Sequence, residues 1–120
     1  MIYIEKKLNF TLYKQDNIQL LKNSVAYFKK IDKILFEVDE SSFEINIKND
    51  DIYLKKETSE HIFILDSTKK EAILTLKQEK ISFDILIEYI NIDINNNKYI
   101  IEYKLESDEE STKIEILFNN

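Results

Sequence analysis

The only histidine of the chain, His61, lies in the segment Ser59-Glu60-His61, which contains the three residue types of a hydrolase triad. Histidine changes its charge near neutral pH, so it is the first candidate for acid–base chemistry. On an extended chain, however, Ser59 and His61 point to one face and Glu60 points to the other, so the three groups cannot converge. We therefore expect a histidine at the surface or at a strand end, and no catalytic residue.

Two acidic segments, Asn49-Asp50-Asp51 and Asp108-Glu109-Glu110, carry oxygen ligands of the kind that calcium prefers. Neither has the alternating ligand spacing or the glycine of a calcium-binding loop. We interpret both as solvated turns. A glycosidase-like carboxylate pair would depend on a separation across a cleft that sequence does not reveal. We predict that the protein is not an enzyme, with carboxylate-based activity as the one enzymatic alternative left open, and that it holds no metal or cofactor.

Absent residue types exclude whole classes of sites, because the 120-residue chain has no Gly, Pro, Cys, Trp or Arg. Without glycine there is no P-loop or dinucleotide-binding fingerprint, and without cysteine there is no disulfide or thiol nucleophile. The net charge is −6, and the absence of Arg removes the bidentate contacts to phosphate and guanine, so we expect no nucleic-acid binding. No apolar run approaches the ~18 residues that cross a bilayer, and charge begins at Glu5. We predict a cytoplasmic protein without membrane contact.

A period of two in the apolar residues dominates the sequence and predicts strands with one buried face. Short polar breaks separate the apolar rows, which favours antiparallel neighbours because a parallel crossover needs about a dozen residues. Since the chain has no glycine, turns that require positive φ are expected to use Asn or Asp, with Asn95-Asn96-Asn97 as the clearest case. The rows run over residues 2–12, 34–38, 43–47, 52–54, 62–65, 72–76, 81–94, 99–105 and 114–118.

Two segments depart from this pattern. In residues 18–31, the apolar residues Ile18, Leu21, Val25 and Phe28 also fit helical spacing, so the pattern leaves strand and helix equally open. Between Ile87 and Ile90 the row changes from odd to even positions, which predicts a bulge near Tyr89 or a bend at a barrel corner.

These rows predict an all-β domain spanning residues 1–120. We expect an antiparallel up-and-down meander of about 8 to 10 strands that closes into a barrel. Closure is favoured because an open sheet of such Ile-rich strands would present apolar edges to water without Pro or Gly to interrupt them.

The order of strands and turns resembles the YwiB-like family of uncharacterised lipocalin-like (calycin-like) β-barrel proteins of low-GC bacteria. The matching stretches are residues 25–30 leading into 33–37, then 43–54, and the terminal pair 99–105 with 113–118. This chain has Lys56-Glu57-Thr58-Ser59 in place of the family's Arg-Ser-Gly-like segment, and Glu79-Lys80 where the family tends to have Gly. The resemblance implies a lipocalin-like barrel in which residues 18–28 form a strand, and it implies no activity.

The aromatic residues on the apolar rows are expected to point into the barrel. A barrel of about eight strands is either filled by its own side chains or holds one small ligand. The bulky rows favour filling, whereas the resemblance favours a cavity. Our first hypothesis is a small apolar ligand lined by Phe36, Phe43, Phe83 and Tyr103. The inward-pointing aromatics are Phe10, Phe36, Phe43, Phe83, Tyr99, Tyr103 and Phe118.

The alternative hypothesis is a protein-interaction module that forms a homodimer through an apolar patch on the outer barrel wall. A third, an acidic mimic that occupies a nucleic-acid site on another protein, is consistent only with the charge. The patch would consist of Leu35, Phe63 with Leu65 or their alternates, Ile73, Leu86, Ile100 and Leu117.

Overall fold

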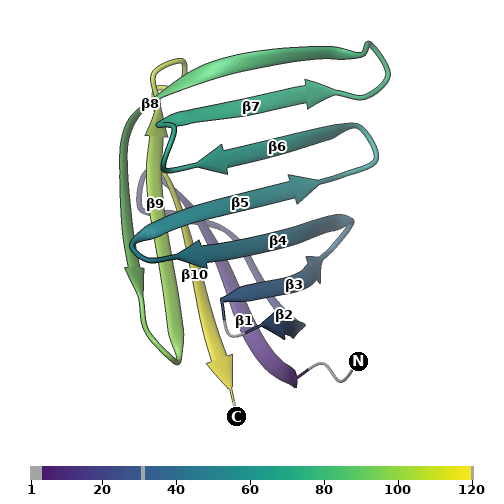
Figure 1. Cartoon of the computed structure of the whole chain (residues 1–120), viewed down its shortest axis with the longest axis vertical. Helices are drawn as coiled ribbons and strands as arrows, with labels where there is room; N and C mark the ends of the chain where they lie inside the picture. The colour runs from purple at the N-terminus through teal and green to yellow at the C-terminus, as the bar shows by residue number, and fades with distance from the viewer. Residues whose placement is uncertain (1–3, 31, 120) are drawn as a thin grey trace.

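Ten antiparallel strands form a closed barrel in the computed structural model, which describes residues 4–30 and 32–119 (Figure 1). Each strand pairs with the next along the chain, and the first pairs with the last, so the predicted all-β closed meander is confirmed. The strands are β1 (Ile4–Lys14), β2 (Asn17–Lys30), β3 (Lys33–Val38), β4 (Ser41–Lys48), β5 (Asp51–Glu57), β6 (His61–Asp66), β7 (Glu71–Leu76), β8 (Ile81–Ile94), β9 (Lys98–Leu105) and β10 (Thr112–Asn119).

The alternation predicted from the sequence produces the core. On β9, Tyr99, Ile101 and Tyr103 are buried, whereas Ile100 and Glu102 between them are only partly covered. The same alternation on the other strands gathers one row of apolar side chains from each into a single interior cluster. The described part of the chain contains no helix that could cross a lipid bilayer.

Residues 17–30 form a strand, as the resemblance implied, while Ile31 and the first residues of the N-terminal row lie outside the described residues. The segment pairs with β1 from Ile4↔Phe28 to Lys14↔Asn17. Among the residues that fit helical spacing, Ile18 and Leu21 are 60% and 64% exposed. The helical spacing therefore does not correspond to a buried face. The pairing with β1 therefore decides the local conformation.

The strands lie in two layers that cross steeply (Figure 1). β3 to β7 run from side to side in this view, and β9, β10, β1 and β2 run from top to bottom behind them. β8 belongs to both layers, because its first half pairs with β7 and its second half with β9. The register with β9 shifts between Ile87 and Tyr89, which confirms the bulge predicted there and places it where β8 changes direction.

The turns use positive φ as expected, but only partly at the residue types expected. Asp16, Asp39 and Asn49 are left-handed, whereas Asn95-Asn96-Asn97 forms a turn without any positive φ. In that turn the Asn97 amide donates to Oδ1 of Asn95, which supplies the turn geometry through a side chain instead. The other left-handed residues are Gln15, Lys70 and Lys80. The prediction that Asn and Asp would occupy all such positions was therefore wrong at those three residues.

Lys80 has φ of 57°. Replacing Lys80 by Gly should remove a Cβ clash worth about 1 to 2 kcal/mol, offset by about 0.5 to 1 kcal/mol from the greater freedom of glycine in the unfolded chain. We expect the free energy of unfolding in urea to rise by about 0.5 to 1 kcal/mol. Glu79→Gly, in the same turn without positive φ, should lower it. Equal losses in both variants would contradict the prediction.

Candidate functional site

Three of the four aromatic residues predicted to line a ligand site lie on one row across the inner face of β3 to β8. Phe36 on β3 pairs with Phe43 on β4, and their rings stack 5.0 Å apart at an interplanar angle of 6°. Phe83 on β8 is the last residue of the same row, and 47% of its surface is exposed. The row consists of Phe36, Phe43, Lys56, Phe63, Leu74 and Phe83, each paired with the next.

Tyr103 on β9 faces this row from the other layer. Its ring stacks on Phe63 with the centroids 6.0 Å apart. Tyr103 and Phe43 line an interior cavity of about 90 Å³. This volume is that of a few water molecules, so the side chains themselves fill most of the space between the two layers at this level. Phe83 is not among the residues that line this cavity, and it ends the row with nearly half of its surface exposed.

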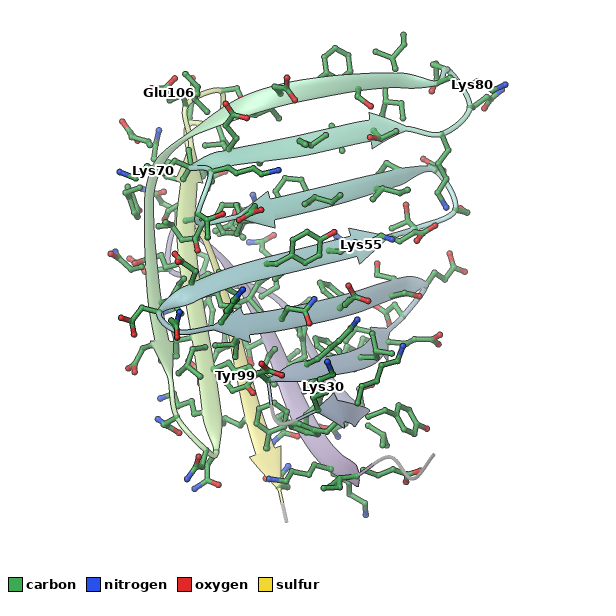
Figure 2. All side chains as sticks on the ribbon, in the orientation of Figure 1. Lys30, Lys55, Lys70, Lys80, Tyr99 and Glu106 are labelled. Carbon is green, nitrogen blue, oxygen red and sulfur yellow. The ribbon has the colours of Figure 1, made fainter. Side chains whose placement is uncertain are left out.

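A larger cavity opens at the end of the barrel that is lower in Figure 1, between β1, β2, β4, β8 and β9. Its volume is about 710 Å³. We call it the lower mouth, and Figure 2 labels two of its residues, Lys30 and Tyr99. Its lining residues are Ile4, Lys6, Phe28, Lys29, Lys30, Asp32, Ile47, Ile94, Asn95, Asn96 and Tyr99.

The inner wall of the lower mouth is aromatic and rests on Phe118 of β10. The ring of Phe118 lies 5.4 Å from that of Phe28 and 4.9 Å from that of Tyr99. Phe118 is itself buried in the core. The wall is thus continuous with the packed interior, which makes it a rigid apolar surface.

Two backbone hydrogen bonds fix the loops at the rim. The Ile47 amide donates to the carbonyl of Asp32 at 2.8 Å, which ties the β2–β3 turn to β4. The Phe118 amide donates to the carbonyl of Asn97 at 2.8 Å, which ties the β8–β9 turn to β10. These bonds hold the two rim loops against neighbouring strands, so the cavity is largely formed without a ligand.

Lysines outnumber carboxylates at the rim. Lys6, Lys29 and Lys30 line the lower mouth together with one acidic residue, Asp32. The Lys6 ammonium lies 5.4 Å from the centroid of the Phe28 ring. Burial raises the pKa of the Tyr99 phenol, and the nearby Asp32 carboxylate raises it further, so the phenol stays neutral at physiological pH.

Tyr99 is one of the aromatic residues that the sequence predicts to point inward, but it is not among those predicted to line a ligand site. Phe28 lay in the segment that the pattern left open between strand and helix. A signal was nevertheless present, because Lys6 occupies the even-numbered row between Ile4 and Leu8. A lysine on a row that otherwise points inward indicates a position near an opening of the barrel.

His61 begins β6, which agrees with a histidine at a strand end. Its Nδ1 lies 3.2 Å from Oγ1 of Thr58, and the Glu60 amide donates to the same hydroxyl. Ser59 and Glu60 belong to the β5–β6 turn, so the extended chain assumed for this segment was wrong, although the triad types still do not converge. Within residues 4–30 and 32–119, no three His, Cys, Asp or Glu side chains form a metal-binding group.

The two acidic segments lie in or beside turns, as predicted. Asp51 accepts a hydrogen bond from the Ser67 hydroxyl at 3.1 Å, and Ser67 accepts one from the Ile52 amide at 2.8 Å. Asp108 accepts from the Glu110 amide within its own turn, which holds the pKa of the Asp108 carboxyl below its usual range, with Lys14 contributing further. Both segments stabilise connections between strands.

The outer wall carries some of the apolar residues expected there. Leu86 and Leu117 are exposed. Ile73 on β7 pairs with Ile64 on β6, which lies on the outer face. Phe63 and Leu65 point inward and pack in or against the core, so their alternates Ile62 and Ile64 occupy the outer face.

A second opening lies in the wall itself, where β2 and β3 separate. Among the described residues, the two strands pair at Tyr27↔Leu35, Phe28↔Ile34 and Lys30↔Lys33. Beyond these pairs the Ser24 hydroxyl donates to the carbonyl of Glu37 across the gap. The resulting cleft, about 780 Å³, is lined by Ser24, Val25, Tyr27, Leu35, Phe36, Glu37, Asp39, Ser42 and Phe43.

No family model matches the chain, and no curated protein matches it in sequence. Among solved structures, the chain is similar to the ywiB protein from Bacillus subtilis, known from its crystal structure. The TM-score is 0.53 at 10% sequence identity, and the match covers 97% of this chain and 91% of that one. At this identity the likeness concerns the fold, and it agrees with the order of strands from which the resemblance was inferred.

Phe43 and Phe83 should differ sharply in their contribution to stability. Phe43→Ala should lower the free energy of unfolding by about 3 to 5 kcal/mol because it empties a packed site. Phe83→Ala should lower it by only about 1 kcal/mol, since nearly half of the ring is already exposed. Urea denaturation of both variants measures the difference. Comparable losses of unfolding free energy would contradict the prediction, because Phe83 would then contribute to the core as much as Phe43.

Burial raises the pKa of the Tyr103 phenol to about 12, and the hydrogen bond with Thr112 only partly opposes this rise. In the unfolded chain the phenol ionises near its ordinary pKa of about 10, so stability should fall as pH rises from about 10 to about 12. The contribution is fully present below pH ~10. In Tyr103→Phe, the free energy of unfolding should fall by about 2 to 3 kcal/mol less over this pH range, as measured by urea titrations at successive pH values. A free energy of unfolding of Tyr103→Phe that falls with pH as steeply as that of the unmodified protein would contradict the prediction.

Proposed function

We propose that the protein binds a small, largely apolar ligand in the lower mouth of the barrel and performs no catalysis there. The observation that carries this proposal is the cavity of about 710 Å³ with an aromatic and aliphatic inner wall. Ligand sites of small molecules commonly have volumes of about 300 to 1,000 Å³ and lie in the mouths of β-barrels. They combine an apolar lining with a few polar groups, as Phe28, Ile47, Ile94 and Tyr99 are combined here with the rim residues.

The lower mouth suits such a ligand better than the site first expected from sequence. The cavity that Phe43 and Tyr103 line has only about 90 Å³, and it could hold little more than water without movement of the surrounding side chains. The cleft between β2 and β3 has sufficient volume, but Glu37 and Asp39 are both among its lining residues. Two carboxylates beside an apolar floor disfavour an apolar ligand, because binding would remove water from them.

A variant that fills the lower mouth tests the proposal. Ile94 lines the cavity at the end of β8, where it packs against the edge of the core, and Ile94→Trp should fill the cavity. The neutral fluorescent probe N-phenyl-1-naphthylamine should bind the unmodified protein with a rise in fluorescence, and Ile94→Trp should abolish that rise. Ile100→Trp is the matched control, because residue 100 lies on the neighbouring strand, one pair away from Ile94↔Tyr99, and faces outward. Equal loss or equal retention of the signal in both variants would contradict the proposed site.

Native mass spectrometry of protein purified without denaturant complements the probe. An additional mass that disappears on denaturation, and that is absent from Ile94→Trp, would support a resident ligand in the lower mouth. A dimer mass without an additional component would instead favour the interaction module with its outer apolar residues.

A further inference from the structure

We propose that the ligand of the lower mouth is an amphipathic monoanion, an alkyl chain that ends in a carboxylate, and that Lys6 binds the carboxylate. This inference rests on the proposed function and specifies the chemical class of its ligand. Three features support it: the position of Lys6, the charge at the rim and the orientation of the apolar wall relative to both.

Lys6 holds an unusual place for a lysine. It pairs with the fully buried Ala26 on β2 and lies on the row between Ile4 and Leu8, so its side chain enters the mouth of the barrel. The side chain is half-buried, and its ammonium lies over the Phe28 ring. The ion pairs found among the described residues involve Lys14, Lys22, Lys33, Lys55, Lys77 and Lys104, each with a carboxylate. Among those same residues, Lys6 has a ring and no carboxylate as its partner.

A half-buried ammonium is stabilised when an anion approaches it, because the anion replaces part of the water that burial removes. The contact with the Phe28 ring holds the ammonium at the boundary between the apolar wall and the rim. A carboxylate bound there would place its alkyl chain against Phe28 and the neighbouring Ile47, Ile94 and Tyr99. Head and tail of an amphipathic molecule would then each meet the surface that suits it.

The charge of the rim agrees with an anion and contrasts with the charge of the molecule. The chain carries a net charge of −6, yet among the described residues that line the lower mouth, Lys6, Lys29 and Lys30 stand against one carboxylate, that of Asp32. Asp32 also lies close enough to Tyr99 to affect its phenol, which makes that side of the rim unfavourable for an anion. The carboxylate is therefore directed toward Lys6 on β1. A single negative charge matches this one half-buried ammonium, since Lys29 and Lys30 are exposed to water.

Competition for N-phenyl-1-naphthylamine tests the head group at constant chain length. Decanoate, decanol and decyltrimethylammonium should each displace the neutral probe, since all three carry the same tail. In the unmodified protein, decanoate should displace it at a concentration about fivefold lower than decanol, and decyltrimethylammonium should be the weakest competitor. Decyl phosphate, added as a fourth competitor, should not surpass decanoate.

Lys6→Gln should remove the advantage of decanoate over decanol and leave the displacement by decanol unchanged. Lys113→Gln is a matched control, because the Lys113 ammonium lies 4.4 Å from the Tyr13 ring centroid, on a residue pair of the outer face. It removes the same charge from the same kind of contact and should preserve the advantage of decanoate.

The outcomes separate this inference from the proposed function. Equal displacement by decanoate and decanol, or an advantage of decanoate that survives Lys6→Gln, would overturn the role of Lys6 while leaving an apolar site intact. A stronger effect of decyl phosphate would overturn the monoanion. Failure of the probe to bind, or binding that Ile94→Trp does not affect, would overturn the proposed function itself.

Discussion

The pairing of β1 with both β2 and β10 is the constraint on which the rest of the structure depends. It closes the sheet over Lys7↔Asn119 to Lys14↔Thr112 on one side and over nearly all of β2 on the other. A chain without Pro or Gly has few means of ending an apolar strand edge, and closure removes the edges altogether. Closure also fixes the register, because a slip of one residue would turn every apolar row of a strand toward water.

The same constraint explains why the molecule is filled in the middle and open at its lower end. Where the two layers face each other, Phe10, Phe36 and Phe43 contact one another at centroid distances of 5.0 to 6.0 Å, and little space remains. Toward the lower end, the ring of Phe118 contacts those of Phe28 and Tyr99, and these two outer rings form a wall that faces a cavity.

The roles of the charged side chains follow from where they lie in the fold, and not from the net charge of the chain. The carboxylates at the turns satisfy local backbone and side-chain donors, as Asp108 and Asp51 do. Lys56 and Lys6 both occupy inward-facing rows, but Lys56 is flanked by Phe43 and Phe63 within the barrel, whereas Lys6 reaches the open mouth. The surroundings of Lys6 thus combine an ammonium, an aromatic wall and free volume, which is the combination that an amphipathic anion requires.

The sequence by itself determined every strand except β2, the antiparallel order and the bulge in β8, because an alternation of period two and its change of phase are local properties of the chain. It also determined that Phe36 and Phe43 point inward. It could not decide between strand and helix for residues 18–31, since a segment with both patterns takes the conformation that its neighbour β1 can pair with. Only the tertiary structure decided that Phe83, on the same inner row as Phe36, ends in solvent, and that Lys6 and Tyr99, 93 positions apart in the sequence, share one cavity. Burial and volume depend on which strands oppose each other across the barrel, and that relation arises from closure over the whole chain rather than from any one segment.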